Sequence, residues 1–250
     1  MDIVVCVKRV PSTDTAIKIA GDGKSIETAG VEFVLNPYDE IAVEQALKTK
    51  EQVGAGSVTV VTLGPKEAQK ELRTTLAMGA DKAVLLTAAG WIHDSRSTAV
   101  ALANWIRTVP CDIVFCGRQA VDSDNNQLPS RLAALLGFGC VTEAAKIDLA
   151  DGTFTVERDI EGAREVLTCR RPAVISCNKG LNEPRYASLK GIMAAKKKPL
   201  EEIPADLPEP ALAIESLALP PARPAGRIVG NGKEAVPDLI QALRNEAKVL

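Results

Sequence analysis

The order of structural elements can be read first in residues 57–88, SVTVVTLGPKEAQKELRTTLAMGADKAVLLTA. Residues 57–64 and 82–88 are apolar, β-branched runs of the kind that form buried strands. Residues 65–79 lie between them and end at Gly79, a residue that commonly terminates helices. A strand, a helix and a second strand in immediate succession predict two parallel strands joined by a helix that covers the sheet.

The same alternation continues on both sides of this stretch. Pro37 and the acidic residues that follow it suit the start of a long helix, because proline fits the first turn and acids favour the positive end of a helix dipole. The sequence therefore predicts an α/β fold with a parallel, helix-covered sheet. The further strands are expected at 2–8 and 112–117, and the further helices at 37–52, 97–109 and 127–137.

The alternation of predicted strands and helices stops after residue 141. Four strand-like runs follow one another with short turns at Asp151-Gly152 and Glu161-Gly162, which predicts an added antiparallel β region. These runs are expected at 142–149, 153–160, 164–170 and 172–178.

The C-terminal part is rich in proline between residues 199 and 224, which predicts an extended arm. Residues 236–250 then have the pattern of an amphipathic helix. We expect an α/β domain over residues 1–198, with a loop at 181–198, and an arm over 199–250 that packs on a partner.

The composition is that of a soluble globular protein, with 46% hydrophobic and 25% charged residues in 250. A net charge of −2 argues against nucleic acid as a partner. We find no signal peptide and no apolar run of about 18 residues, so we expect a protein that is not itself in the membrane and that begins at Asp2.

The six cysteines include no C-x-x-C pair, and His93 is the single histidine of the chain. This pattern predicts reduced thiols that pack as small apolar side chains, and no metal site. We expect His93 to be a surface residue, because no partner for it is visible in the sequence.

Three polar stretches follow predicted strands or precede predicted helices: VKRVPST (7–13), LNPYDE (35–40) and GRQAVDSDNNQLPS (117–130). In an open parallel sheet, ligands bind beyond the carboxyl ends of the strands, so these stretches should meet there. Gly117 permits a tight turn, and the polar residues 122–126 stand ahead of a helix that begins near Gln127. From local chemistry alone, a loop that merely caps its helix is the favoured interpretation, and a phosphate bound at the helix start is the alternative.

The sequence lacks G-x-G-x-x-G and G-K-[ST], the signatures of Rossmann dinucleotide binding and of P-loop hydrolysis. It also shows no nucleophile with a base beside it, and Asp122 and Asp124 are expected to shape a turn. We therefore expect a nucleotide-sized site without catalytic machinery. An adenine-nucleotide-dependent enzyme or sensor remains the alternative.

Residues 180–199, GLNEPRYASLKGIMAAKKKP, contain a helix-breaking Pro184 followed by an apolar set and three lysines. From composition alone, packing in the core is the favoured interpretation of Leu189.

Long and unusual strings in this chain resemble the β subunit of electron transfer flavoprotein. They run through the whole chain, in the order VCVKRVP, LNPYDEIAVEQAL, LAMGAD, GRQAVDSDNNQ, VERDIEG, RPAVISCN and LNEPRYASLKGIMAAKKK. The resemblance implies an adenine-nucleotide-binding, Rossmann-like fold and an electron-carrier subunit without a bond-making active site of its own. It further implies location in the bacterial cytoplasm, or in the mitochondrial matrix of a eukaryote.

The partners implied by the resemblance are an α subunit, with FAD in that subunit or at the interface, and the proteins on either side of the electron path. Acyl-CoA or related dehydrogenases of fatty acid or amino acid oxidation donate electrons, and a membrane quinone oxidoreductase or similar acceptor receives them.

The resemblance also implies a structural AMP in this subunit, or a second FAD at the same place in electron-bifurcating members. Ser123 and Leu128 depart from residues that are common in AMP-binding relatives, whereas residues 125–127 and 39–44 favour AMP. The implied AMP site consists of Cys6, Asn36, Pro37, Tyr38, Asp39, Leu63, Gly117, Gln119, Ala120, Asp122, Ser123, Asp124, Asn125, Asn126, Gln127 and Leu128.

Two further sets come from the resemblance. Arg158 and Asp159 would face the flavin of the partner, where Arg158 could stabilise a reduced, anionic flavin and Asp159 could hold that arginine or the mobile flavin domain. Thr15 stands where some relatives have an aromatic residue that touches the flavin. Leu189 would anchor a docking surface for dehydrogenases, Lys196 to Lys198 would steer it toward an acidic rim, and the implied docking residues are Tyr186, Leu189, Ile192 and Met193.

Overall fold

The structure is a computed structural model that describes residues 1–90, 94–223 and 225–250. His93, expected at the surface, lies outside the described residues. The chain divides into two compact units, Met1–Glu215 and Ser216–Leu250.

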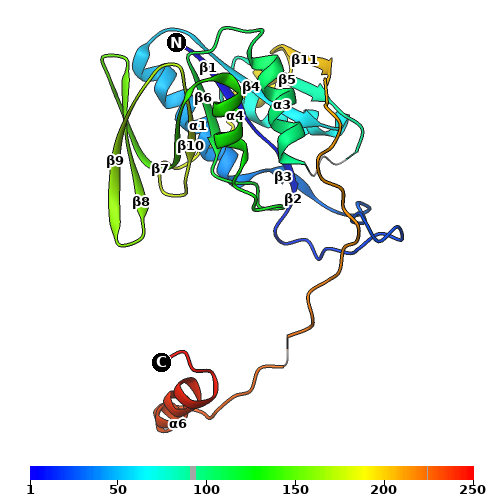
Figure 1. Cartoon of the computed structure of the whole chain (residues 1–250), viewed down its shortest axis with the longest axis vertical. Coiled ribbons are helices and arrows are strands. Elements are labelled where there is room, and N and C mark those ends of the chain that lie inside the picture. The colour runs from blue at the N-terminus through cyan, green and yellow to red at the C-terminus, as the bar shows by residue number, and fades with distance from the viewer. Residues whose placement is uncertain (91–93, 224) are drawn as a thin grey trace. The chain divides into compact units, whose positions relative to one another are not determined.

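A nine-stranded sheet forms the centre of the first unit, in the order β11-β5-β4-β1-β6-β10-β7-β8-β9 (Figure 1). The strands from β11 to β7 pair in parallel, and β7, β8 and β9 pair antiparallel. The predicted α/β fold with an added antiparallel region is confirmed. The strands of this sheet are β1 (Asp2–Cys6), β4 (Ser57–Gly64), β5 (Lys82–Thr87), β6 (Ile113–Gly117), β7 (Gly139–Ala150), β8 (Thr153–Ile160), β9 (Ala163–Arg170), β10 (Ala173–Cys177) and β11 (Leu200–Pro204).

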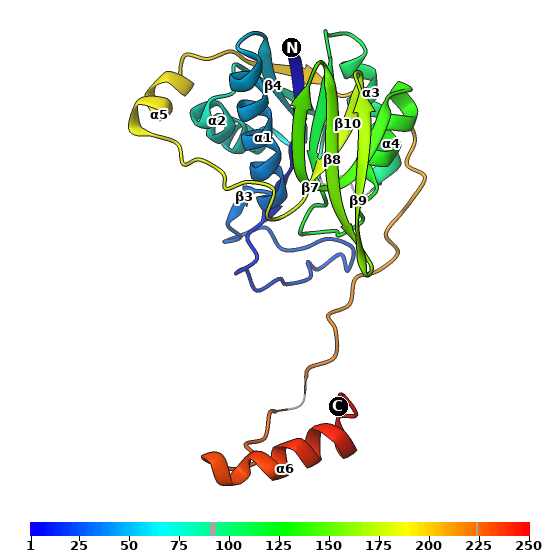
Figure 2. The same ribbon diagram turned by 90° about the vertical axis from the view of Figure 1, so that its left-hand side faces the viewer.

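Helices cover both faces of the parallel part: α1 and α2 lie on one face, and α3 and α4 lie on the other (Figure 2). Alternate residues of the central strands serve the two layers, since Ile3 and Val5 pack toward α1 while Val4 and Cys6 pack toward α3 and α4. The helices of the first unit are α1 (Pro37–Val53), α2 (Gln69–Met78), α3 (Ser95–Ile106), α4 (Leu128–Leu136) and α5 (Leu189–Ala195).

Strand β10 corrects one part of the sequence prediction. Residues 172–178 were expected to join the antiparallel region, but β10 lies between β6 and β7 and pairs in parallel with both. All five of its residues are buried. A continuous apolar run of this kind suits a strand that is covered on both faces, which the antiparallel hairpin cannot provide.

The boundary of the arm also differs from the prediction. Residues 200–204 form β11, an edge strand that pairs with β5, and the first compact unit continues to Glu215. After β11 the chain runs beside α3, where the Ala211 N–H donates to Asp94 at 2.8 Å and Asn104 donates to Asp206 at 3.3 Å. The prolines of 199–224 therefore do not prevent an edge strand, which can accommodate proline at positions where the backbone nitrogen points away from the sheet and no N–H donor is needed.

Smaller differences concern the ends of elements. The helix expected over 65–79 begins with a 3₁₀ turn (Lys66–Ala68), and α3 begins two residues before the expected 97 because Asp94 caps it. A small antiparallel sheet of β2 (Arg9–Pro11) and β3 (Phe33–Leu35) was not predicted. Its strands are too short to show a period of two in the sequence.

The predicted packing of free thiols holds for Cys6, Cys116, Cys169 and Cys177, which are buried, whereas Cys140 is exposed. None of the helices in the described ranges combines the length and the apolar character needed to span a membrane.

The second unit, Ser216–Leu250, ends in the predicted helix. The helix consists of a 3₁₀ turn (Lys233–Ala235), α6 (Val236–Gln241) and a π-helical turn (Ala242–Glu246). Leu239 and Ile240 are exposed, which leaves an apolar side without cover from the unit itself.

Candidate functional site

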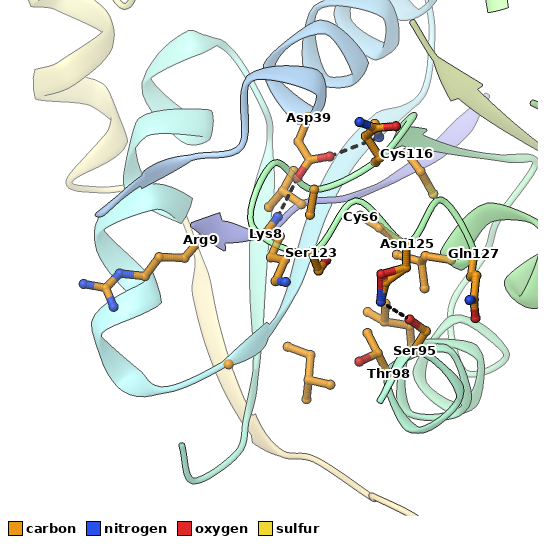
Figure 3. Close-up of a pocket in the computed structure, with 18 of the residues that line it drawn as sticks. Cys6, Lys8, Arg9, Asp39, Ser95, Thr98, Cys116, Ser123, Asn125 and Gln127 are labelled. Atoms are coloured by element: carbon orange, nitrogen blue, oxygen red, sulfur yellow. Dashed lines mark hydrogen bonds between the residues drawn. The ribbon is translucent and has the colours of Figure 1, made fainter. Parts of the chain in front are cut away.

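A pocket lies at the carboxyl ends of β1, β4 and β6, where the sequence predicted a ligand site (Figure 3). Apolar residues from β4 and the helices line it together with the loop from Gly117 to Gln127. The lining residues are Cys6, Val7, Lys8, Arg9, Asp39, Leu63, Gly64, Pro65, Ala68, Gly90, Ser95, Thr98, Leu102, Cys116, Gly117, Arg118, Gln119, Ala120, Ser123, Asn125, Asn126, Gln127, Leu128 and Pro129.

Asp39, in the first turn of α1, joins the ends of the two central strands. Its carboxylate accepts the Lys8 N–H at 2.7 Å and the Gly117 N–H at 3.1 Å (Figure 3). Gly117 must be glycine for this approach, since a Cβ there would lie 2.8 Å from Tyr38 Cβ and closer still to the carboxylate. Asp39 therefore sets the distance between α1 and the floor of the pocket.

Burial raises the pKa of the Asp39 carboxyl from 3.8 to about 7, because desolvation disfavours the charged form. The bonds from Asn36, Lys8 and Gly117 and the charge of Lys8 act in the opposite direction.

The loop from Gly117 to Gln127 is braced by bonds to other elements. Asn36, directly before α1, donates to the Gln119 carbonyl at 2.9 Å and accepts the Val121 N–H at 3.2 Å. Lys8 forms an ion pair with Asp122 at 2.6 Å. The loop is therefore held to both α1 and the segment after β1, which makes a preformed wall.

The starts of α3 and α4 both face this pocket but differ in their caps. The Asp94 carboxylate accepts the Arg96 N–H at 2.9 Å and so occupies the start of α3. Gln127, at the start of α4, provides no side-chain cap. The start of α4 is therefore the better place for an anionic group. Asn125 connects the two sides by donating to Ser95 Oγ at 2.7 Å (Figure 3).

The Cys116 thiol of the pocket is not activated for nucleophilic attack. Cys6 and Cys116 lie side by side on β1 and β6. A hydrogen bond with Cys6 and burial raise the pKa of the Cys116 thiol well above its usual value, so it stays protonated. Within the described ranges, no group of His, Cys, Asp or Glu side chains could hold a metal ion.

Most of the residues predicted for the AMP site line the pocket, but Asn36, Pro37, Tyr38, Asp122 and Asp124 do not. Asn36 and Asp122 brace the loop as described above. Asp124 accepts a bond from Gln119 at 2.7 Å and, as predicted, shapes the turn, with a left-handed φ of 48°.

Sequence reasoning missed the contribution of α3 to the pocket. Ser95 and Thr98 come from the start of this helix, which follows β5. The rule that places ligands at the carboxyl ends of strands applies to this connection too, and the Asp94 cap was the signal available in the sequence.

Arg158 and Asp159 lie on β8, outside the pocket lining. Arg158 pairs with Glu165 at 2.6 Å and donates to Thr142 at 2.9 Å. Asp159 pairs with Arg164 at 2.9 Å. Neighbouring β9 thus supplies an ion-pair partner for each of the two side chains, and the expected role of Asp159 toward Arg158 or the flavin domain stays a prediction.

The predicted docking residues lie together in the segment 182–195. Tyr186 is 99% exposed and Leu189 is 85% exposed, and Ile192 and Met193 are exposed on α5. The interpretation of Leu189 as a core residue is therefore wrong. Lys198 was expected to help steer the segment toward an acidic rim. Its ammonium instead donates to the Leu76 and Ala80 carbonyls at 3.1 and 2.6 Å, so it is not available for steering.

Comparison with known proteins places the chain in a family. The model of the electron transfer flavoprotein domain matches residues 24–208. The electron transfer flavoprotein subunit beta of Bacillus subtilis is 40% identical over 260 residues, and that of Bradyrhizobium diazoefficiens is 40% identical over 251 residues; both matches cover 100% of each chain. A mitochondrial subunit beta of Oryza sativa subsp. indica is 38% identical, again over 100% of each chain. The chain therefore belongs to the electron transfer flavoprotein family, as one of its β subunits.

Proposed function

We propose that this chain forms a heterodimer with an α subunit that carries FAD, and that it serves by binding and positioning. In this proposal the complex accepts electrons from acyl-CoA or related dehydrogenases and passes them to a quinone oxidoreductase or a similar acceptor. The membership of the chain among β subunits supports the pairing. The raised pKa of the Cys116 thiol agrees with a pocket that carries out no nucleophilic chemistry.

The pocket at the carboxyl ends of β1, β4 and β6 would hold AMP. Leu63, Ala68 and Leu102 offer an apolar surface for the base, and the polar loop with Lys8 offers partners for ribose and phosphate. The start of α4, which has no side-chain cap, would receive the phosphate. This pairing of an apolar side with an uncapped helix start is the observation that carries the proposal.

The exposed segment 182–195, here called the docking segment, would meet the dehydrogenase. An apolar pair such as Tyr186 and Leu189 at 99% and 85% exposure has no role in the core of this chain. Apolar and aromatic side chains that enter a partner's pocket commonly supply most of the binding energy of an interface.

Arg158 on β8 would face the flavin, and the arm with its C-terminal helix would pack on the α subunit. The exposed Leu239 and Ile240 on α6 support the second assignment, since a helix with an apolar side gains stability by covering it.

The test is to purify the chain with its α subunit, release the bound nucleotides with acid and identify them by chromatography. We expect one FAD and one AMP per heterodimer. Two FAD would instead place the protein among the electron-bifurcating members. Turnover of ATP by the isolated chain would contradict the carrier function and favour an adenine-nucleotide-dependent enzyme.

A further inference from the structure

We propose that Arg185 is the positioning residue of the docking segment, because its ion pair with Glu44 of α1 fixes the conformation in which Tyr186 and Leu189 are presented. The proposal rests on the docking function proposed above and adds the device that makes it specific.

The docking segment needs such a device because its first half has no regular structure. No helix or strand lies between Cys177 and Leu189, a stretch wholly within the described residues. Ordering a free loop when a partner binds is entropically unfavourable, and a loop that is already held in the bound conformation avoids this loss.

The Arg185 guanidinium bonds to two carboxylates of α1, those of Glu44 and Glu51. Its Nε and Nη2 donate to the two Glu44 carboxylate oxygens at 2.7 and 3.0 Å, and its backbone N–H donates to the same carboxylate at 3.1 Å. Nη1 also donates to Glu51 at 2.6 Å. The Glu44 side chain is only 3% exposed, so Arg185 is the partner of a buried charge.

A second contact, from Asn182, fixes the same stretch on α1. Asn182 donates to the Ile41 carbonyl at 3.1 Å and to Gln45 at 3.3 Å. Residues 182–185 therefore follow the surface of the helix, and Tyr186 is the first residue beyond the anchor.

The other end of the docking segment is anchored on α2. Arg73 donates to the Ala195 and Lys198 carbonyls at 2.7 and 2.9 Å. Gly191 lies so close to the Ala77 carbonyl that a Cβ would overlap it. The exposed Tyr186 and Leu189 thus lie between an anchor on α1 and an anchor on α2.

The experiment uses the full chain purified with its α subunit, and an acyl-CoA dehydrogenase reduced by its acyl-CoA as the probe. We would compare R185Q and R185K with the wild type in three measurements. The first is kcat and KM of the dehydrogenase with the heterodimer as its electron acceptor, and the others are the flavin midpoint potential and the melting temperature of the heterodimer. Lysine retains the charge but lacks the planar fork that reaches both oxygens of Glu44. R107Q is the matched control, since Arg107 is an exposed, hydrogen-bonded arginine on the α3 side of the sheet.

We expect R185Q to raise KM about tenfold, with kcat and flavin potential unchanged, and R185K to give a smaller rise of the same kind. R107Q should match the wild type. A folded R185Q with a wild-type KM would overturn the proposal and leave Arg185 with a structural role only.

Two additional variants keep the test decisive. L189A tests the docking function itself: if L189A has a wild-type KM, docking through this segment is wrong, whatever R185Q shows. If R185Q fails to fold, E44L/R185M removes both charges and leaves no unpaired carboxylate. A folded E44L/R185M variant should still have a raised KM, and a wild-type KM would again overturn the proposal.

Discussion

Two segments are attached to α1, and they use the helix in different ways. The loop from Gly117 to Gln127 is attached to the start of α1, through Asn36 and Asp39, and it lines a pocket. The docking segment is attached to the middle of α1, through Glu44, and exposes Tyr186 and Leu189 to solvent.

The difference shows how one helix can serve two recognition tasks. The inner loop is held mainly by bonds from Asn36 and Asp39 to its backbone, and the ion pair between Lys8 and Asp122 adds to them. The docking segment is held at its two ends, by Arg185 and Asn182 on α1 and by Arg73 of α2, which leaves the apolar side chains between these anchors free to enter a partner. The predictions below test whether each segment depends on α1 in this way.

The broadest effect, on both stability and nucleotide content, is expected for Gly117→Ala. The new methyl group has no space between Tyr38 and the Asp39 carboxylate, so we expect a loss of about 1–3 kcal/mol in the free energy of unfolding and loss of bound nucleotide. Urea unfolding and chromatography of released nucleotide measure the two effects. Gly21→Ala is the matched control, with open space around it. Wild-type nucleotide content in Gly117→Ala would show that α1 does not set the shape of the pocket.

The second prediction concerns pH. Burial raises the pKa of Asp39 from 3.8 to about 7, so at pH 5 the folded chain retains a proton that the unfolded chain has released. The stabilisation from this proton is present at low pH and is lost as pH rises through 7. Between pH 5 and 8, wild type should therefore lose about 2–3 kcal/mol relative to Asp39→Asn, which cannot titrate.

Denaturant unfolding at several pH values measures this difference. Asp14→Asn removes an exposed carboxylate and serves as the control. Wild-type and Asp39→Asn curves that stay parallel from pH 5 to 8 would contradict a buried, proton-binding Asp39.

The third prediction separates docking from packing. Leu189→Ala should raise KM for the dehydrogenase by about tenfold while the free energy of unfolding stays within about 0.5 kcal/mol of wild type. Leu72→Ala is the contrasting variant, because Leu72 is fully buried on α2 and its truncation should lower the free energy of unfolding by about 2–5 kcal/mol. Equal losses of stability in both variants would show that Leu189 packs in a core after all.

The smallest effect is expected on the flavin. Arg158→Gln in the heterodimer should shift the flavin midpoint potential to more negative values by an amount on the order of tens of millivolts, since a half-exposed cation already paired with Glu165 acts weakly. Arg164→Gln removes a neighbouring exposed arginine and should leave the potential unchanged. An unchanged potential in Arg158→Gln would argue that β8 does not face the flavin.

Much of the pocket could be predicted from the sequence because its residues stand next to strong local signals. Gly117 ends an apolar strand, and Asp39 follows Pro37 at a helix start. The contribution of Ser95 and Thr98 was missed, since only folding brings the connection after β5 to the same edge of the sheet.

The sequence by itself determined the alternation of strands and helices, because periods of 2 and 3.6 residues are properties of local chain geometry. It also determined the family, through strings that extend along the whole chain. The tertiary structure alone decided where β10 and β11 pair, since an apolar run does not state which strand lies beside it. It also decided that Leu189 faces solvent, because a leucine at helical spacing is consistent with either burial or exposure until its neighbours are placed.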